Sequence, residues 1–502
     1  MNGQKNIITI LFFLLTINIR LTAQESKRLS LNSVLQSNMV IQQNKPFKIW
    51  GSAPAGETVA ITADWIKTPI KVIADAENKF LGILPVPVIK KGDFTKHQLV
   101  VSGNDESVTL TNLLIGETWI CSGQSNMQFS MKETIDSAKE IPAANCPNIR
   151  LFSSGLNFSN EPIDTIRGSW QECSPLSVRN FSAVAYHFGR ELYNTLNVPV
   201  GIIFTGIGAS AAQAYVPRDV LAADPLLDSM YLQPYLRSPR SKEKMTGGFS
   251  FEKVTRPFLL YNAIIHPFTN LSLRGFTWYQ GEANRMERES YTKLTQAMIE
   301  SWRTNFGQGN LPFYYVQVAP FWYDKADSTL ADYAFFREAQ EKISGLNNTE
   351  MVLTMDVGEA RNLHPKNKKP VGVRLAKTAL NREYGLLEVP YCGPQYDYVV
   401  FDSRKAVIHF QTQTIKSGLS TNNGSPPDFF TMAGADKVFY PATALIMGKD
   451  IVVTSAKVKK PVAVRYAFTN FAVTNLQNND GFPAVPFRTD HWDEVKTGNE
   501  QK

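Results

Sequence analysis

Hydrophobic and polar positions follow three successive patterns along the chain. From residue 29 to residue 111, short apolar or alternating runs are separated by turn sequences such as "PAGE" and "SGNDE", with no helical period. Short strands without helices are typical of a β-sandwich, which we assign to residues 24–112. The expected strands cover residues 47–53, 58–64, 70–86 and 97–103.

Between residues 113 and 385, strand-like runs alternate with amphipathic helical stretches. This alternation predicts an α/β domain with a doubly wound parallel sheet. The expected strands are "LLIGETWIC", "VPVGIIFTG", "LRGFTWYQG", "LPFYYVQVA" and "EMVLTMDVG". The expected helices include "SAVAYHFGRELYNTL", "ESYTKLTQAMIESWRTNF", "DYAFFREAQEKI" and "PVGVRLAKTALNREY". The polar stretch at 235–250 is interpreted as an insertion or mobile loop.

Helical periodicity ends after Tyr384, and strand-like runs with Gly, Pro and Asn breaks return. Residues 386–502 are therefore expected to form a C-terminal β-rich domain. The predicted fold class is α/β, with a central sheet between two flanking β-domains.

The first residues have a pattern of their own. Lys5 precedes an apolar core from Ile7 to Ile17, and the segment ends in "LTA". This is the layout of a secretory signal peptide over residues 1–23, so we expect an exported, periplasmic or extracellular protein. A membrane anchor is the alternative, but the core is short and Arg20 interrupts it. No membrane span is expected after the signal is removed.

Charge and cysteine content narrow the function further. The formal net charge of +7 comes without a Lys/Arg cluster interleaved with aromatic residues, so we expect no nucleic-acid partner. The four cysteines lack zinc-site spacing, and no metal site is expected. Cys146 and Cys173 share one loop-rich stretch and could pair.

Candidate chemistry follows the ends of the expected strands, where ligands bind in open parallel sheets. Ser125, Gly208, Asn284 and His364 each follow a different strand. A serine needs a neighbouring imidazole to become a nucleophile, and the oxyanion needs aimed N–H donors. Each residue alone fits an ordinary turn or cap, so only the set indicates acyl transfer. There is no GxSxG, HExxH or GxxxxGK[ST] motif.

Three blocks, "GETWICSGQSNM", "WYQGEAN" and "LHPKNK", resemble the signature blocks of the sialate O-acetylesterase family, a branch of the SGNH hydrolase superfamily. The likeness extends over nearly the whole chain after residue 23. It implies hydrolysis of sugar O-acetyl esters without a cofactor, with Ser125 as nucleophile and His364 as general base and acid. It also implies oxyanion donors at Gly208, Asn284 and the N–H of Ser125.

The chain departs from this pattern at several positions. Ala209 and Tyr215 stand where the family usually has Gly and Trp, and Ala283 stands where Ser is common. The Asp that usually precedes the catalytic His, and orients it, is replaced by Asn362 or Arg361.

Several residues remain candidates for supporting roles. Glu359 and Asp356 are the candidate orienting acids, while Glu282 or a backbone carbonyl could serve instead. Gln124, Gln280 and Glu282, which lie within the signature blocks, are candidates for substrate binding.

These observations predict an exported carbohydrate O-acetylesterase whose partner is an O-acetylated sugar or glycan. The 9-O-acetyl ester of sialic acid is the first expected substrate, and acetylated xylan or another polysaccharide is the alternative. A glycan-binding protein without catalytic activity on a degenerate esterase fold is the alternative of another class. The sequence leaves the acetylated hydroxyl, the oligomeric state and the third triad member open.

Overall fold

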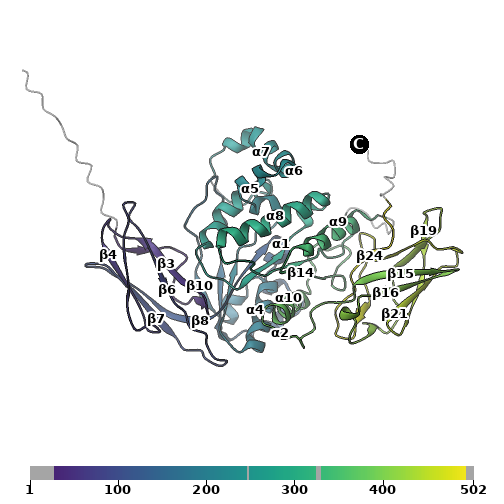
Figure 1. Ribbon diagram of the computed structural model, residues 1–502, viewed down its shortest axis with the longest axis horizontal. Helices are drawn as coiled ribbons and strands as arrows, with labels where there is room; N and C mark the ends of the chain where they lie inside the picture. The colour runs from purple at the N-terminus through teal and green to yellow at the C-terminus, as the bar shows by residue number, and fades with distance from the viewer. Residues whose placement is uncertain (1–27, 246–247, 324–329, 493–502) are drawn as a thin grey trace, which may run out of the picture.

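The computed structural model describes residues 28–245, 248–323 and 330–492. The expected signal peptide lies outside these residues. Figure 1 shows three regions in a row, with the α/β region between two regions made of strands. The prediction of an α/β class with β-rich flanks agrees with this arrangement. Among the described residues, no helix combines the length and apolarity needed to cross a membrane.

The N-terminal region consists of two small sheets packed on a shared core. Strands β1, β3 and β6 form one sheet, and β4, β5 and β7 join the start of β8 in the other. Alternate residues of β6 are buried, as expected for a strand with one face on the core. The strands are β1 (Ser30–Leu31), β2 (Val40–Gln42), β3 (Phe47–Ser52), β4 (Thr58–Ala63), β5 (Ile70–Ile73), β6 (Lys79–Leu84) and β7 (His97–Ser102).

Strand β8 (Ser107–Gly123) belongs to two regions at once. Its first residues, 107–113, pair antiparallel with β7, whereas residues 117–121 pair parallel with β11 and 119–123 with β12. The expected domain boundary after residue 112 therefore lies inside a continuous strand. Glu117, where β8 enters the central sheet, is buried and accepts hydrogen bonds from Arg274 at 2.7 and 3.0 Å.

The central sheet has the order β10-β9-β11-β8-β12-β13-β14. All neighbours pair parallel except the edge strand β10, which is antiparallel to β9, so the sheet is mixed at one edge. Strands β9 and β10 were not among those expected, because Pro147, Asn148 and Arg150 interrupt the apolar positions of β9 and β10 has only four residues. The remaining strands are β9 (Cys146–Ser153), β10 (Trp170–Cys173), β11 (Val200–Phe204), β12 (Gly275–Tyr279), β13 (Phe313–Val316) and β14 (Thr349–Val352).

Helices cover both faces of this sheet (Figure 1). The pair α4 and α10 packs on one face, and α8 and α9 pack on the other. All four long helices lie where the amphipathic stretches predicted them. The α-helices are α1 (Ser125–Gln128), α2 (Ser137–Glu140), α3 (Pro175–Val178), α4 (Ala183–Leu196), α5 (Arg218–Ala223), α6 (Pro225–Leu227), α7 (Gln233–Arg237), α8 (Glu289–Phe306), α9 (Asp332–Glu341) and α10 (Lys369–Arg382).

Short 3-10 and π-helical turns connect these elements. The expected loop at 235–250 in fact begins within helix α7 and continues into the turn η4. The turns are η1 (Met131–Glu133), η2 (Ala212–Tyr215), η3 (Asp228–Leu232), η4 (Pro239–Lys242), η5 (Lys253–Thr255), η6 (Tyr261–Ile265), η7 (His266–Phe268), η8 (Glu282–Asn284), η9 (Lys342–Gly345) and η10 (Thr412–Thr414).

The C-terminal region is built from antiparallel strands around its own core. Two four-stranded sheets, β15-β16-β21-β20 and β19-β18-β22-β24, are accompanied by the pair β17-β23. The strands are β15 (Tyr396–Asp402), β16 (Lys405–Phe410), β17 (Leu419–Thr421), β18 (Phe430–Ala433), β19 (Phe439–Pro441), β20 (Thr443–Met447), β21 (Asp450–Thr454), β22 (Ala463–Tyr466), β23 (Leu476–Asn478) and β24 (Phe487–Arg488).

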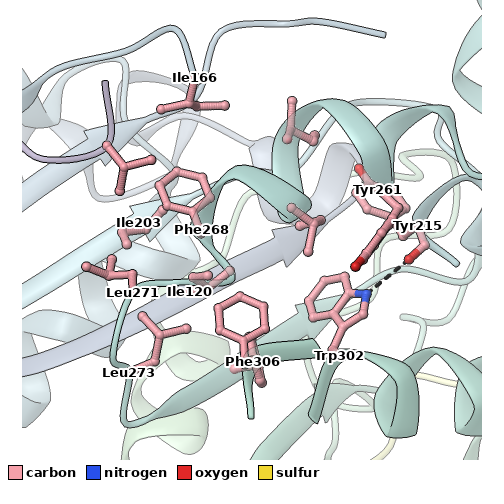
Figure 2. Close-up of a cluster of buried hydrophobic side chains, with 14 of the residues drawn as sticks. Ile120, Ile166, Ile203, Tyr215, Tyr261, Phe268, Leu271, Leu273, Trp302 and Phe306 are labelled. Atoms are coloured by element: carbon pink, nitrogen blue, oxygen red, sulfur yellow. Dashed lines mark hydrogen bonds between the residues drawn. The ribbon is translucent and has the colours of Figure 1, made fainter. Parts of the chain in front are cut away.

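One large apolar core joins the N-terminal region to the α8 side of the central sheet. Figure 2 shows Trp302 of α8 in this core, donating from Nε1 to the carbonyl of Tyr215 at 3.0 Å. Trp302 is fully buried and packs against the rings of Phe276 and Trp278. Helix α8 is thereby fixed to the loop that follows β11.

The cysteine pairing considered from the sequence is not formed. Cys146 and Cys173 lie opposite each other across β9 and β10, but all four cysteines are free. The strand register shifts at Cys173, whose Sγ donates to the carbonyl of Ala144 at 3.5 Å. The Cys173 thiol therefore has a backbone acceptor and forms no disulfide.

Candidate active site

Ser125 lies directly beyond the carboxyl end of β8, as the sequence predicts. Gly123 ends the strand with a φ of 141°, a conformation that favours glycine. A Cβ at Gly123 would lie 2.2 Å from the carbonyl oxygen of Tyr279, so the chain can turn closely past β12 only without a side chain. The turn starts helix α1 at Ser125 and leaves its side chain partly exposed.

His364 follows β14 and meets Ser125 across the sheet edge. Its Nε2 lies 2.8 Å from Ser125 Oγ, within hydrogen-bond distance. Burial lowers the pKa of His364, and the nearby charge of Lys368 lowers it further, while Glu133 opposes both. A lowered pKa keeps the imidazole neutral near pH 7, the form that can accept the proton of the serine.

Gly208, one of the expected oxyanion donors, lies beside Ser125. A Cβ built on Gly208 would be 3.7 Å from Ser125 Cβ. Its N–H donates to Gln128 Oε1 at 2.7 Å, and Gln128 is an exposed side chain of helix α1. The donor is thus occupied by an exposed side chain, which an oxyanion would have to displace.

Asn284, the other expected side-chain donor, is buried in turn η8. Its Oδ1 accepts from the Ala212 N–H at 3.0 Å and from Gln280 Nε2 at 2.7 Å, which fixes the orientation of the amide. Its Nδ2 donates to Gln213 Oε1 at 3.0 Å and to the Glu287 carboxylate at 3.1 and 3.2 Å. Donation from Nδ2 to an oxyanion therefore requires one of these acceptors to be displaced.

Replacing Gly208 by alanine is expected to leave the fold intact and to lower kcat/KM by about 10–100-fold, because small displacements at a reacting centre are costly. The new methyl would meet Gln128 Oε1 at 2.9 Å and lie against Ser125. The φ of Gly208 is not positive, so alanine fits the backbone. Steady-state kinetics beside a thermal melt checks this, with Gly345→Ala as control because no atom lies near its Cβ position. An unchanged kcat/KM would show that Gly208 does not take part in the reaction.

The two candidate orienting acids have other partners. Asp356 is bound by Arg374 at 2.7 and 2.6 Å. Glu359 accepts from Asn362 Nδ2 at 3.0 Å and from the Lys366 N–H at 2.7 Å. Within the described part of the chain, no side chain hydrogen-bonds to Nδ1 of His364.

The three candidate substrate-binding residues are buried behind the site. Gln124 Oε1 accepts from the N–H groups of Gly281 and Ala283 at 3.3 and 3.2 Å. Gln280 Nε2 binds the Asn284 amide, and Glu282 Oε1 accepts from Asn126 Nδ2 at 2.5 Å. Gln124 and Glu282 thus connect the loops that carry Ser125 and Asn284, whereas Gln280 connects the Asn284 loop to the Ser210 carbonyl at 3.1 Å.

The departures at Ala209 and Tyr215 occupy defined positions. Ala209 has a φ of 59°, in the left-handed region where the glycine common in the family is favoured. Tyr215 is fully buried beneath the loop, with its hydroxyl 3.2 Å from the Ile207 N–H and 3.0 Å from the Gly123 carbonyl. Its hydroxyl therefore connects the loop that carries Gly208 to the end of β8.

Four further residues surround the serine and histidine but were not singled out from the sequence: Asn126, Gln128, Glu133 and Lys368. Asn126 and Lys368 lie within or next to the signature blocks, so their positions alone could have drawn attention to them. Glu133, an exposed residue of turn η1, carries no sequence signal, because its influence on His364 depends on tertiary structure.

Glu133 provides a prediction about pH. Its negative charge raises the pKa of His364, so Glu133→Gln should lower that pKa and move the acidic limb of the kcat/KM profile to lower pH. Glutamine can still accept from the Ser130 N–H, which keeps the turn. Glu140→Gln is the control, since Glu140 pairs with Lys369 at 2.6 Å. Identical acidic limbs in the kcat/KM profiles of Glu133→Gln and wild type would contradict the prediction.

No group of three or more His, Cys, Asp or Glu side chains that could hold a metal ion is present in the described ranges. The arrangement instead brings a serine hydroxyl, an imidazole and backbone N–H groups to the edge of an α/β sheet. Such a set can support attack on an ester carbonyl. Fold and site together define an ester hydrolase.

Comparison with known proteins places the chain more narrowly. Residues 116–381 match the family model described as carbohydrate esterase, sialic acid-specific acetylesterase, and the chain belongs to this family. The sialate O-acetylesterase of Mus musculus is 28% identical over 409 residues, covering 72% of this chain and 75% of the mouse protein. The Homo sapiens sialate O-acetylesterase is 26% identical over 419 residues, covering 75% of each chain.

A solved structure extends the similarity over the flanking regions. The crystal structure of a carbohydrate acetylesterase from Xanthomonas citri superposes with a TM-score of 0.81 and 32% identity. The match covers 92% of this chain and 100% of the Xanthomonas chain. The protein is therefore an esterase of acetylated carbohydrates, as its sequence blocks indicate.

Proposed function

We propose that the protein cleaves sugar O-acetyl esters through Ser125 and His364. The single observation that carries this mechanism is the 2.8 Å contact between Ser125 Oγ and His364 Nε2 at the edge of the sheet. His364 takes the serine proton as Oγ bonds to the acetyl carbonyl carbon. The same proton then passes to the sugar oxygen as its bond to the acyl carbon breaks.

The second half of the reaction reverses these roles. A water molecule gives a proton to His364 and attacks the acetyl-serine, and acetate leaves as the proton returns to Ser125 Oγ. The negative oxygen of each tetrahedral intermediate is bound by the N–H groups of Ser125 and Gly208 and by Asn284 Nδ2. Gln128, which occupies the Gly208 donor, and one of the two acceptors of Asn284 Nδ2, Gln213 or Glu287, must move when the substrate binds.

The proposed substrate is the 9-O-acetyl ester of sialic acid. The family description and the mouse and human relatives support sialic acid as the sugar, since all carry its name. An acetylated polysaccharide such as acetylxylan is the second candidate. The Xanthomonas citri structure favours it, because that match is the higher in identity and coverage and its name specifies only a carbohydrate.

Acetate release from 9-O-acetylated sialic acid, with Ser125→Ala beside the wild type, tests the proposal. Release by the wild type alone supports both substrate and nucleophile. Ser125-dependent release only from acetylated xylan would keep the mechanism and replace the substrate. Silence of both proteins on every acetyl ester would contradict the enzymatic proposal and favour a glycan-binding protein.

We also propose that the enzyme acts after export, in the periplasm or outside the cell. The signal-like pattern of residues 1–23 supports this location. N-terminal sequencing of the expressed full-length chain tests it. A mature protein that begins after Ala23 is expected, and an uncleaved chain in the cytosolic fraction would contradict export.

A further inference from the structure

Asn126, the residue after Ser125, uses its whole side-chain amide in hydrogen bonds. Nδ2 donates to Glu282 Oε1 at 2.5 Å and to the carbonyl of Leu363 at 3.1 Å, and Oδ1 accepts from Lys368 Nζ. A backbone carbonyl only accepts, so Nδ2 and not Oδ1 must face Leu363, and the two ends of the amide cannot be exchanged. Asn126 is fully buried, and this orientation is therefore fixed.

These bonds reach both ends of the segment that carries the base. Leu363 immediately precedes His364, and Lys368 follows it by four residues. The same amide follows Ser125 in the chain, so one side chain connects the nucleophile's helix to both sides of the base. By contrast, the His364 ring itself has Ser125 as its only hydrogen-bond partner among the described residues.

The partners of Asn126 include two ionisable side chains, and burying ionisable groups costs free energy. Lys368 is 1% exposed, and its Nζ lies 4.9 Å from the ring centre of Phe129 and 5.6 Å from that of Tyr279. Burial lowers the pKa of Lys368 to about 7, although Glu282, Glu359 and Glu133 oppose this.

Glu282 is also buried, and burial raises its pKa. Its Oε2 has no hydrogen-bond partner in the described structure. Apolar side chains of the same size would fill this space more cheaply, so stability alone does not account for the set.

We propose that Asn126, held by Glu282 and Lys368, is the positioning residue that sets the distance and direction between Ser125 and His364. It acts through the backbone of the His364 segment, in place of a carboxylate on the imidazole. The inference rests on the proposed Ser–His mechanism. A reacting pair tolerates errors of only about 0.5 Å, so a buried amide that fixes both partners suits this task.

The test compares Asn126→Ala with wild type on a small activated acetyl ester. Loss of positioning should lower kcat about 100-fold. KM should change less than about threefold, because Ser125 and His364 carry out the reaction and do not hold the substrate. Asn478→Ala is the matched control. Asn478 is equally buried in the C-terminal region, donates to Cys392 and Thr414 carbonyls, and accepts from the Phe482 N–H. That variant should lose thermal stability and keep kcat.

Three more variants cover the case in which Asn126→Ala does not fold. Lys368→Met keeps the buried volume, removes one of the bonds to Asn126, and should lower kcat about tenfold on the pH plateau. Removing this charge should also raise the pKa of His364, the direction in which Glu133 already acts, and move the acidic limb to higher pH. Asn126→Asp places oxygen against the Leu363 carbonyl and Glu282, and adding Glu282→Gln should restore part of kcat by supplying a donor.

His364→Ala, measured in parallel, separates the two levels of inference. If His364→Ala is inactive but Asn126→Ala and Lys368→Met keep wild-type kcat, the positioning role is overturned and the Ser–His mechanism stands. If His364→Ala keeps full activity, the mechanism fails, and the positioning role fails with it. A fall in melting temperature without a fall in kcat would identify Asn126 as structural only.

Discussion

Replacing Ser125 by alanine should reduce acetate release by a factor on the order of 10⁶, as loss of the nucleophile does in a serine hydrolase. The substitution removes one oxygen whose only side-chain hydrogen-bond partner in the described structure is His364 Nε2 at 2.8 Å. No packing is lost, because the side chain is partly exposed. Melting temperature and far-UV circular dichroism should therefore match the wild type, and kinetics alone should change.

His364→Ala should cost a similar factor, and the double variant should be no slower than either single variant. Residues that act as one unit lose their effect together, so their losses do not add. Ser425→Ala, at an exposed serine of the C-terminal region, is the control and should be fully active. Additive losses in the double variant would show that the two residues act in separate steps.

Replacing Trp302 by alanine should lower the free energy of unfolding by about 4 kcal/mol, the usual cost of truncating a buried tryptophan. The indole is fully buried in the cluster of Figure 2 and packs 5.3 Å from the ring of Phe276. It also donates to the Tyr215 carbonyl at 3.0 Å. The alanine variant leaves a large cavity and an unsatisfied carbonyl.

Because Tyr215 supports the Gly208 loop, Trp302→Ala should also lower kcat at temperatures where the protein is still folded. Trp302→Phe keeps most of the apolar volume and loses only the hydrogen bond, so about 1–2 kcal/mol is expected. Urea unfolding followed by circular dichroism measures both variants. Equal stability of the alanine and phenylalanine variants would mean that the hydrogen bond, and not the packing, supplies the stabilisation.

The sequence predicts long elements well and short ones poorly. Helix α8 follows the expected stretch residue for residue, because eighteen residues contain five turns of periodic apolar positions. Strand β10 has only four residues, "WQEC", two of them polar, and its place at the sheet edge depends on pairing with β9. Such pairing is a tertiary contact, which no local pattern encodes.

The candidate active site also has a part that the sequence predicts and a part that it does not. Ser125 and His364 could be placed near each other because parallel strands end at one edge. The surroundings of His364 could not be predicted, since they depend on where side chains point. Asp356 and Glu359 are close in sequence, but Arg374, Asn362 and the Lys366 N–H hold their carboxylates. Asn126, which connects the two catalytic candidates, was not identified from the sequence, because an asparagine in this position also fits an ordinary turn.

Strand β8 has a consequence for any attempt to treat the protein as a set of interchangeable modules. Strand β8, which leads to Ser125, begins in the ladder with β7, and its middle residues pair with β2. A shortened enzyme that starts at residue 113 would have lost β2 and the beginning of this strand, and its freshly exposed apolar edge would favour aggregation. The N-terminal strands thus help to hold Ser125 in position. They could be replaced only together with β8 itself.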